Sequence, residues 1–399
     1  MSLRRRFLSL LALRWFATGL LMPVSLLLPL ERGLTIAEVG LAMAAQGVLV
    51  ILLEVPSGAL ADAWGRRPVF IASGLVAVAA YAATFVAQSV AAFALAWAIS
   101  GVFRALDSGP LEAWFVDAER ARDAADEVPR GLAAAGGVIS VAIAAGSLVS
   151  AGLLRVVPGP VEDALAVPYL VAIGVVLVQV VCSWRFMDAT AASARPSSAA
   201  WRGALASGVR VAFGPRLRLL SSAMALVGVA VAALEMFIPV RLAEFTPDAS
   251  DAAAVLGVVS SAAWGVAALG ALVTTRALRR LSPALLTPAL FAVEALGLVA
   301  MAAATGVGIL VAGYWLCYLV HTSSGATFNA LVHERVDDAQ RATALSVNSM
   351  AFLGTAAAGG VALGALADAS SASAALVVGA AFMGAAALLV VAAVRPRQR

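Results

Sequence analysis

Seven charged residues interrupt stretches of sequence that are otherwise apolar and long enough to cross a bilayer. A charge inside a membrane span costs at least about 2.5 to 3.5 kcal/mol, so such a residue normally faces protein or a watery cavity and has a partner. Carboxylates and arginines in this setting can hold helices together, bind a charged solute or carry protons. The seven residues are Arg14, Glu54, Arg104, Asp107, Glu112, Glu235 and Glu294.

Three of these residues are predicted to form one layer near the inner boundary of the membrane. At about 1.5 Å of rise per residue, Arg14, Glu54 and Glu112 should each lie roughly 7 to 12 Å above that boundary. Arg104 and Asp107 are three residues apart and can pair on one helix face, which leaves two carboxylates competing for Arg14. Two acids that share one cation in a poorly solvated site cannot both stay ionised cheaply. The spacing therefore favours Glu54 as a proton carrier tuned by Arg14 and Glu112, with a helix-pinning ion triad as the alternative.

A polar and aromatic stripe follows helical spacing in the tenth apolar run. Tyr314, Tyr318 and His321 share one face, and Asn329 lies at its edge. Because hydroxyls and an imidazole are costly against lipid, we expect this face to line a cavity. His321 lies near the middle of the run and can titrate in the physiological range. A histidine that only bonds a neighbouring helix is the alternative.

The remaining charged and polar candidates stand singly. Glu235, in the seventh apolar run, can attract a cation or pair with Arg241 or another neighbour. Ser108 shares the helix face of Arg104 in the fourth run. Glu294 lies in the ninth run, and we interpret it as a structural residue that pairs to hold helices together.

A short basic turn ends the second apolar run. Asp62 stands at the end of that run, and Gly65, Arg66 and Arg67 follow before the next one begins. Arginines beside membrane spans are retained on the cytoplasmic side, so the turn should face the cytoplasm. Arg66 can bridge Asp62 and Asp117, the latter at the end of the fourth run. We expect this latch to hold the inward gate shut in the outward-open state, with a weak surface salt bridge as the alternative.

The turn resembles a motif of the major facilitator superfamily. That motif joins the second and third helices with glycine, three residues, aspartate, arginine, one residue, glycine and two basic residues. The matching residues here are Gly58, Asp62, Gly65, Arg66 and Arg67, and Ala63 stands where the first arginine would be. The resemblance implies two helical bundles that move a solute by alternating access, with a cavity lined by spans one, four, seven and ten. It also implies that Asp62 faces the N-terminus of span eleven, whose helix dipole favours an anion.

The elements that must position these residues are helices. The chain is 62% hydrophobic and 13% charged, whereas soluble domains carry about 25% charged residues. Its apolar runs predict an all-α membrane protein with twelve transmembrane helices in two six-helix pseudo-repeat bundles. The runs are residues 7–30, 37–61, 68–88, 90–117, 131–155, 165–187, 218–244, 251–275, 284–304, 306–332, 342–367 and 372–394. We expect an N-terminal bundle at 1–187, a cytoplasmic linker at 188–215 and a C-terminal bundle at 216–399.

The placement of arginine predicts the orientation of these helices. All 27 basic residues are arginines, and the twelve-span layout puts 22 of them on one side and 3 on the other. The crowded side is the cytoplasmic one, so both termini should be cytoplasmic and the protein should lie in the cytoplasmic (plasma) membrane. The sequence GALADA occurs at Gly58–Ala63 and again at Gly364–Ala369, in spans that run in opposite directions. An inverted repeat inside each bundle would produce this echo.

Several chemistries are disfavoured by the sequence. A nucleotide-binding loop with its lysine is impossible in a chain without lysine, so transport driven by ATP is not expected. A zinc-type helix motif and a nucleophile elbow are also missing from the sequence. We therefore predict no enzyme activity, no cofactor, no metal and no nucleic-acid partner, and we expect a monomer.

Together these patterns predict a secondary active transporter whose partners are a small-molecule substrate, protons and the lipid bilayer. Proton-coupled efflux of a small amphiphilic organic solute is the leading version. The acidic residues and the aromatic stripe favour a cationic or neutral solute. Uptake of a sugar, amino acid or similar nutrient is the alternative within this class. A membrane sensor or scaffold that does not transport is the alternative from another class.

Overall fold

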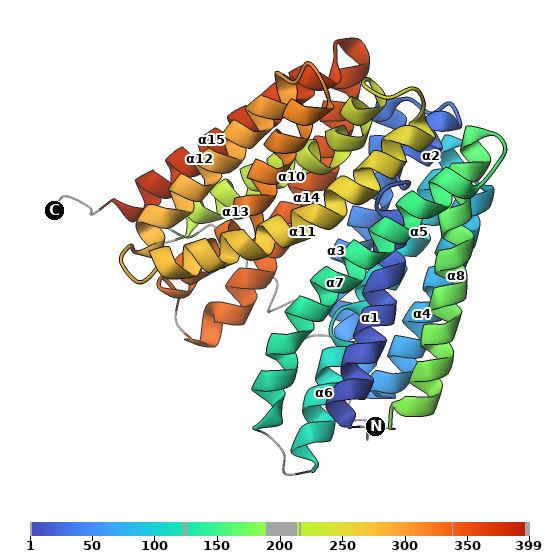
Figure 1. The fold of residues 1–399 in the computed structure, drawn as a ribbon. Helices are drawn as coiled ribbons and strands as arrows, with labels where there is room; N and C mark the ends of the chain where they lie inside the picture. The colour runs from blue at the N-terminus through green and yellow to red at the C-terminus, as the bar shows by residue number, and fades with distance from the viewer. Residues whose placement is uncertain (1, 123–125, 189–213, 215–216, 337, 396–399) are drawn as a thin grey trace. The chain divides into compact units, whose positions relative to one another are not determined.

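A computed structural model describes residues 2–122, 126–188, 214, 217–336 and 338–395. This described part of the chain is built from helices and contains no strand. In chain order the helices are α1 Leu3–Leu21, α2 Leu27–Glu31, α3 Ile36–Trp64, α4 Arg66–Val86, α5 Val90–Asp107, α6 Pro110–Arg120, α7 Glu127–Val156, α8 Val161–Phe186, α10 Arg218–Ala243, α11 Ala249–Ala277, α12 Pro283–Ala302, α13 Val307–His333, α14 Asp338–Ala369 and α15 Ala372–Val394 (Figure 1). The proposed linker at 188–215 lies outside the described residues except for Asp188 and Gly214.

Eleven segments of the described chain are long and apolar enough to cross a membrane, with α5 and α6 together making one of them. The remaining predicted span corresponds to α1. This helix is less apolar because it carries four arginines, three of which, Arg4, Arg5 and Arg6, lie at its first turn. Arginines at the end of a span can reach the interface while their stems stay in the apolar layer, so their position suits a helix that begins at the membrane surface.

The helices group into two compact units. The first comprises Met1–Leu34, Ala42–Ser197 and Thr246–Ser261, and the second comprises Thr35–Leu41, Ser198–Phe245 and Ala262–Arg399. Two helices, α3 and α11, therefore each belong partly to one unit and partly to the other. The first turn of α3 belongs to the second unit, where the Asp368 carboxylate at the end of α14 accepts hydrogen bonds from the backbone N–H groups of Ile36 and Ala37, at 3.1 and 2.8 Å.

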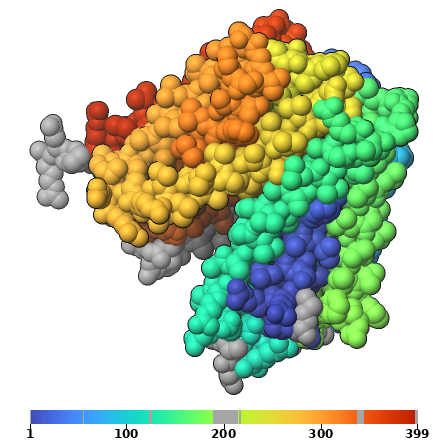
Figure 2. Space-filling model, viewed as in Figure 1, coloured from blue at the N-terminus to red at the C-terminus, as the bar shows by residue number. Residues whose placement is uncertain are grey.

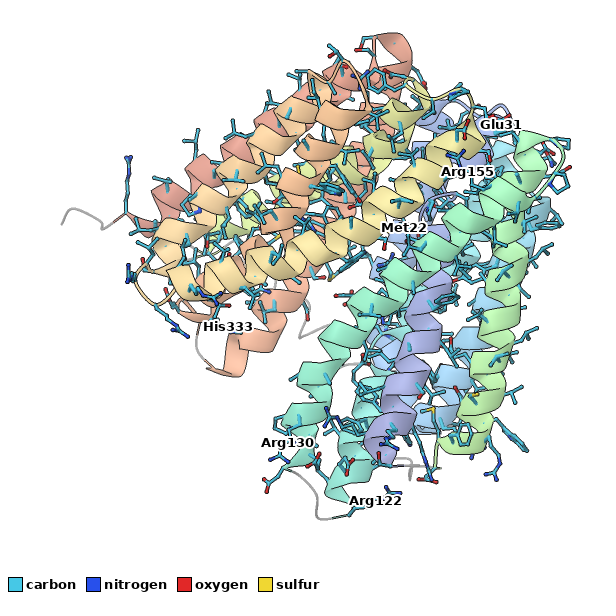
Figure 3. The ribbon with its side chains drawn as sticks, in the orientation of Figure 1. Met22, Glu31, Arg122, Arg130, Arg155 and His333 are labelled. Carbon is cyan, nitrogen blue, oxygen red and sulfur yellow. The ribbon has the colours of Figure 1, made fainter. Side chains whose placement is uncertain are left out.

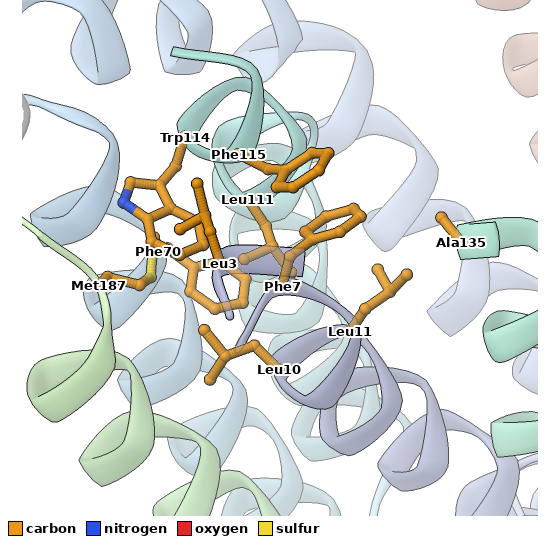
Figure 4. Packing of buried hydrophobic residues seen from close by; sticks show 10 residues of the cluster. All are labelled: Leu3, Phe7, Leu10, Leu11, Phe70, Leu111, Trp114, Phe115, Ala135 and Met187. Carbon is orange, nitrogen blue, oxygen red and sulfur yellow. The ribbon is translucent and has the colours of Figure 1, made fainter. Parts of the chain in front are cut away.

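One end of the first unit, where α1 begins, is closed by an aromatic and aliphatic cluster. Phe7 of α1 stacks on Phe115 of α6, with ring centroids 4.4 Å apart and planes 11° from parallel. Trp114 and Phe70 pack beside them, as Figure 4 shows, and both are almost fully buried. The cluster joins α1, α4, α6, α7 and the end of α8, so it fixes the helix ends that carry the basic turn.

Helices α1 and α7 approach each other closely at two glycines. A Cβ atom added at Gly19 would overlap with the carbonyl oxygen of Ile143, and one added at Gly146 would overlap with that of Phe16. Ser147 Oγ also donates to the Gly19 carbonyl at 3.1 Å. Without side chains at these two positions, the backbones come into direct contact, and Figure 2 shows the surfaces of the two helices side by side.

The ends of the first unit carry the charges that the topology assigns to opposite membrane surfaces. Figure 3 shows Arg122 and Arg130 at one end of this unit, and Arg155 and Glu31 at its other end. Arg155 pairs with Asp251 of α11 at 2.9 Å, within the same unit. This arrangement agrees with the prediction that Arg122 and Arg130 lie at the membrane surface opposite to that of Arg155.

The fourth span is broken, where the sequence analysis predicted an uninterrupted run at 90–117. Helix α5 ends at Asp107, and α6 begins at Pro110. Gly109, between them, has φ +93°, in the left-handed region that favours glycine. Proline at the first helical position then suits the start of a new helix, because it has no N–H to leave unpaired. The first predicted span, 7–30, is also interrupted, since α1 ends at Leu21 and α2 begins at Leu27.

Candidate functional site

In the first unit, a buried ion pair joins the middle of α1 to the end of α5. Arg14 Nε lies 2.5 Å from Asp107 Oδ2, and Arg14 Nη1 donates to Thr18 Oγ1 at 2.6 Å. The guanidinium also lies 4.5 Å from the centroid of the Phe103 ring, close enough for a cation–π contact. Arg14 is 8% exposed, so both charges of the pair are held inside the unit.

The break in the fourth span explains why Asp107 needs this partner. As the last residue of α5, Asp107 lies where the helix dipole is negative and disfavours a carboxylate. Arg14 supplies the compensating charge from another helix. Half-helices that end inside a membrane span are a common setting for transporter binding sites, which makes this position a candidate site.

The predicted pairing between Arg104 and Asp107 is wrong. Asp107 pairs with Arg14, while the Arg104 side chain is exposed and has no ion-pair partner among the described residues. Arg14 makes no ion pair with Glu54 or Glu112 in that part of the chain. Glu54 is half-buried, and its Oε2 is buried without a hydrogen-bond partner. Glu112 is half-buried in the first turn of α6.

A second polar cluster lies inside the second unit, around the aromatic stripe of α13. Tyr318 donates its hydroxyl hydrogen to Glu235 Oε1 of α10 at 3.0 Å. Trp264 of α11 meets the Tyr318 ring edge to face, with centroids 6.1 Å apart, and the Tyr314 ring lies 4.7 Å away. The stripe predicted from the sequence thus reaches Glu235, which is half-buried, through the Tyr318 hydroxyl.

One turn further along α13, a histidine meets a buried carboxylate. His321 Nδ1 lies 2.8 Å from Glu294 Oε1 of α12, and Ser324 Oγ lies 3.5 Å from Glu294 Oε2. Glu294 is 1% exposed, whereas the His321 side chain is 31% exposed. The pair therefore consists of a carboxylate sealed inside the unit and an imidazole that reaches its surface.

Other residues singled out from the sequence lie outside these two clusters. Ser108 is exposed at the break between α5 and α6, and Asn329 is exposed on α13. Arg241, considered as a partner of Glu235, pairs instead with Glu244 and donates to the carbonyl of Ala304 at 2.6 Å. The described residues hold no group of three or more metal-ligating side chains.

The predicted bridge at the basic turn is confirmed. Arg66 Nη1 lies 2.7 Å from Asp62 Oδ1, and Arg66 Nε lies 3.7 Å from Asp117 Oδ2. Gly65 has φ +93° at the junction of α3 and α4, which explains why the motif carries a glycine there. The side chain of Arg67 takes no part in this bridge and donates to the backbone carbonyl of Trp184 at 2.5 Å. Gly58 lies one turn before Asp62 in α3 and is exposed.

A family model for the Major Facilitator Superfamily matches residues 7–332, which is more than half of the chain. The chain belongs to the major facilitator superfamily. No curated protein sequence matches it significantly.

Solved structures of transporters of the major facilitator type share the fold of this chain. The nucleoside transporter NupG superposes with a TM-score of 0.84 at 14% identity, covering 100% of each chain. A POT family transporter in complex with a thioalcohol-conjugated peptide gives 0.74 at 11% identity, over 98% of this chain and 95% of that one. The Escherichia coli fucose:proton symporter FucP gives 0.59 at 15% identity, over 98% of each chain.

These likenesses confirm the predicted all-α, twelve-helix fold of the superfamily, and the family assignment makes the protein a multi-pass membrane transporter. The Glu294–His321 pair is the candidate that the sequence analysis missed, because Glu294 was interpreted as structural and His321 was considered alone. The available signal was the isolation of Glu294, which is the one ionisable residue in the sequence of α12.

Proposed function

We propose that this superfamily member is a proton-coupled secondary transporter of a small organic solute, working by alternating access in the cytoplasmic membrane. The observation that carries the coupling is the 2.8 Å contact between His321 and the buried Glu294 carboxylate. Family membership supports transport, and the presence of a proton symporter among proteins of the same fold supports coupling to protons.

The Glu294–His321 pair contains two groups that can bind a proton, whereas the Arg14–Asp107 pair contains one. Arginine is not deprotonated in proteins, so in the Arg14–Asp107 pair only the carboxyl group can bind a proton. Histidine is the side chain whose charge changes in the physiological range. The Glu294–His321 pair can therefore share one proton, lose it or accept a second one, and the partly exposed imidazole connects the pair to the surface of the unit.

Glu54 remains the competing proton site from the sequence analysis. Its Oε2 is buried without a hydrogen-bond partner, which is a costly arrangement for an ionised carboxylate. However, the cation that was expected to tune it, Arg14, is already matched by Asp107. We therefore place the coupling proton on Glu294 and His321, and treat Glu54, Glu112 and Arg14 as the rival assignment.

The chemistry around Glu235 supports a cationic or neutral solute with an apolar part. Tyr314, Tyr318 and Trp264 present aromatic surface beside one carboxylate, and aromatic faces attract organic cations. We propose efflux of such a solute as the leading direction. Uptake of a nutrient is the second candidate, favoured by the shared fold with a nucleoside transporter and a fucose:proton symporter.

The test uses purified protein in proteoliposomes that contain a pH-sensitive dye, with a solute library and a proton gradient imposed in either direction. We expect at least one solute to move protons with it, and the gradient orientation that drives the solute gives the direction of transport. Solute movement that leaves the internal pH unchanged contradicts proton coupling. Failure of every solute to move would favour the sensor or scaffold alternative.

Matched variants assign the proton site. Glu294→Gln should abolish transport driven by a pH gradient but retain exchange of labelled for unlabelled solute, because the amide keeps the shape and loses the titrating group. Glu31→Gln, at an exposed carboxylate, is the control and should behave like wild type. Gradient-driven transport that survives Glu294→Gln and disappears in Glu54→Gln would transfer the role to Glu54.

A further inference from the structure

A hollow at the edge of the first unit lies beside the basic turn. It has a volume of about 460 Å³ and is formed where α3 ends, α4 begins and α8 ends. Two tryptophans flank it, Trp64 and Trp184, and their side chains are 64% and 65% exposed. Ile71 and Leu75 continue the hollow along α4, and Leu75 is 52% exposed.

Arg67 gives this otherwise apolar hollow a positive charge. Its Nη2 donates to the Trp184 carbonyl at 2.5 Å, and it has no carboxylate partner among the described residues. The neighbouring Arg66 holds both nearby acids, Asp62 and Asp117. Arg185, next to Trp184, is exposed and also lacks an ion pair in the described part of the chain. The Arg67 guanidinium is therefore available here to an anion from outside the protein, and Arg185 adds a second positive charge one residue from Trp184.

The position of the hollow indicates the kind of anion. The turn contains two arginines, Arg66 and Arg67, and arginines beside membrane spans are typical of the cytoplasmic surface. Exposed tryptophans are typical of the level of the lipid headgroups. Above Arg67, Ile71 and Leu75 offer an apolar track that runs from this level into the hydrocarbon layer. A phosphate can take two parallel hydrogen bonds from an arginine fork.

We propose that this hollow binds an anionic phospholipid of the cytoplasmic leaflet, with its phosphate on Arg67, its headgroup between Trp64 and Trp184, and an acyl chain along Ile71 and Leu75. The unmatched charge of Arg67 and Arg185 selects a headgroup of net negative charge over a zwitterionic one. Basic pockets on the cytoplasmic side of membrane proteins recognise anionic lipids on the same physical grounds.

The experiment measures lipid binding to the delipidated full-length protein in detergent, by native mass spectrometry and by the rise in unfolding temperature. Phosphatidylglycerol and phosphatidylcholine with the same acyl chains are titrated in parallel, and glycerol phosphate without chains separates a lipid site from a simple phosphate site. We expect phosphatidylglycerol to bind more tightly than the other two. Equal binding of the two lipids, or binding of glycerol phosphate as tight as that of phosphatidylglycerol, would overturn the proposal.

Variants locate the site. Arg67→Gln should weaken phosphatidylglycerol binding about fivefold, the effect of one interfacial cation, and leave phosphatidylcholine unchanged. Arg67→Lys should retain most of the preference for phosphatidylglycerol over phosphatidylcholine, and Arg185→Gln should lose part of this preference. Because two further variants are measured, the conclusion does not depend on the folding of Arg67→Gln. Arg280→Gln is the matched control, because Arg280 is exposed, predicted to be cytoplasmic and remote in sequence from the hollow. An Arg67→Gln variant that binds phosphatidylglycerol like Arg280→Gln would remove the assignment.

Discussion

Asp368 holds the first turn of α3 through a 2.8 Å hydrogen bond from the Ala37 backbone N–H to its Oδ2. It belongs to the second GALADA sequence, and Asp62 occupies the same place in the first. Both aspartates lie in the last turn of one helix and bind the first turn of another, since Asp62 pairs with Arg66 at the start of α4. The repeated sequence thus has a repeated structural role, which is to tie the end of one helix to the start of another. Asp368 does so through backbone N–H groups, and Asp62 does so through the Arg66 side chain.

Replacing Asp368 with alanine should lower the free energy of unfolding by about 0.5 to 2 kcal/mol, as for loss of a helix cap. The reason is that two N–H groups at the start of α3 lose a charged acceptor. Thermal unfolding in detergent measures the change. Asp126→Ala is the control, because Asp126 precedes α7 without making a side-chain cap hydrogen bond. Equal stabilities of the two variants would contradict the capping role.

Asp107→Asn should destabilise the protein by about 3 to 5 kcal/mol, because it leaves the buried Arg14 cation without its partner. The double variant Arg14→Gln with Asp107→Asn should be more stable than Asp107→Asn alone, since it removes the stranded charge. Chemical or thermal unfolding of the four proteins completes the double-mutant cycle. Simple addition of the two single effects would show that the residues do not depend on each other.

Gly109→Ala tests the break in the fourth span. The left-handed conformation at φ +93° costs a residue with a Cβ about 1 to 2 kcal/mol, and no neighbouring atom lies close enough to add a clash. Gly152→Ala, within α7 and also in open space, should stabilise the protein by up to about 1 kcal/mol. Unfolding temperatures of the two variants should therefore shift in opposite directions. A neutral or stabilising Gly109→Ala would argue for an uninterrupted fourth span.

Asp62→Asn should slow transport and change the balance between inward-open and outward-open states, while stability changes by less than about 1 kcal/mol. The small effect on stability follows from exposure, since the Asp62 and Arg66 side chains are 42% and 25% exposed. Transport assays and accessibility labelling in liposomes measure both quantities. Arg122→Gln, which breaks an exposed pair with Asp188, is the control. The latch is refuted if Asp62→Asn and Arg122→Gln leave transport equally unaffected.

Reporter fusions test the orientation. Reporters placed after Arg202 and at the C-terminus should both register as cytoplasmic, because the arginine asymmetry places these segments inside. An insertion at Gly159, in the loop between α7 and α8, should register outside. A periplasmic signal from either of the first two reporters would exclude the twelve-span orientation.

The sequence predicted best those features that are set by residues close together along the chain. Apolar runs located the spans, and the Asp62–Arg66 bridge followed from a separation of four residues at a helix junction. The break at Gly109 was also readable, because the Ser108-Gly109-Pro110 sequence is a strong turn signal. The prediction of an unbroken span rested on the length of the surrounding apolar run alone.

The two buried polar pairs could not be predicted because they depend on how helices are rotated about their axes. A helix that is apolar all round gives no periodic signal for the face that it buries. Helix α12 is of this type, so nothing in its sequence shows that Glu294 meets His321 of α13. Likewise, Arg104 was the nearest arginine to Asp107 in sequence, but Arg14 is the one that reaches it across helices.

The backbone contact at Gly19 and Gly146 has a mechanical consequence for α1 and α7. Without side chains to act as a compressible layer, neither helix can roll or slide on the other unless the contact is first pulled apart. A displacement of Arg14 at the middle of α1 must therefore carry α7 with it. We expect the two helices to move together, and the ion pair with Asp107 joins them to the break of the fourth span.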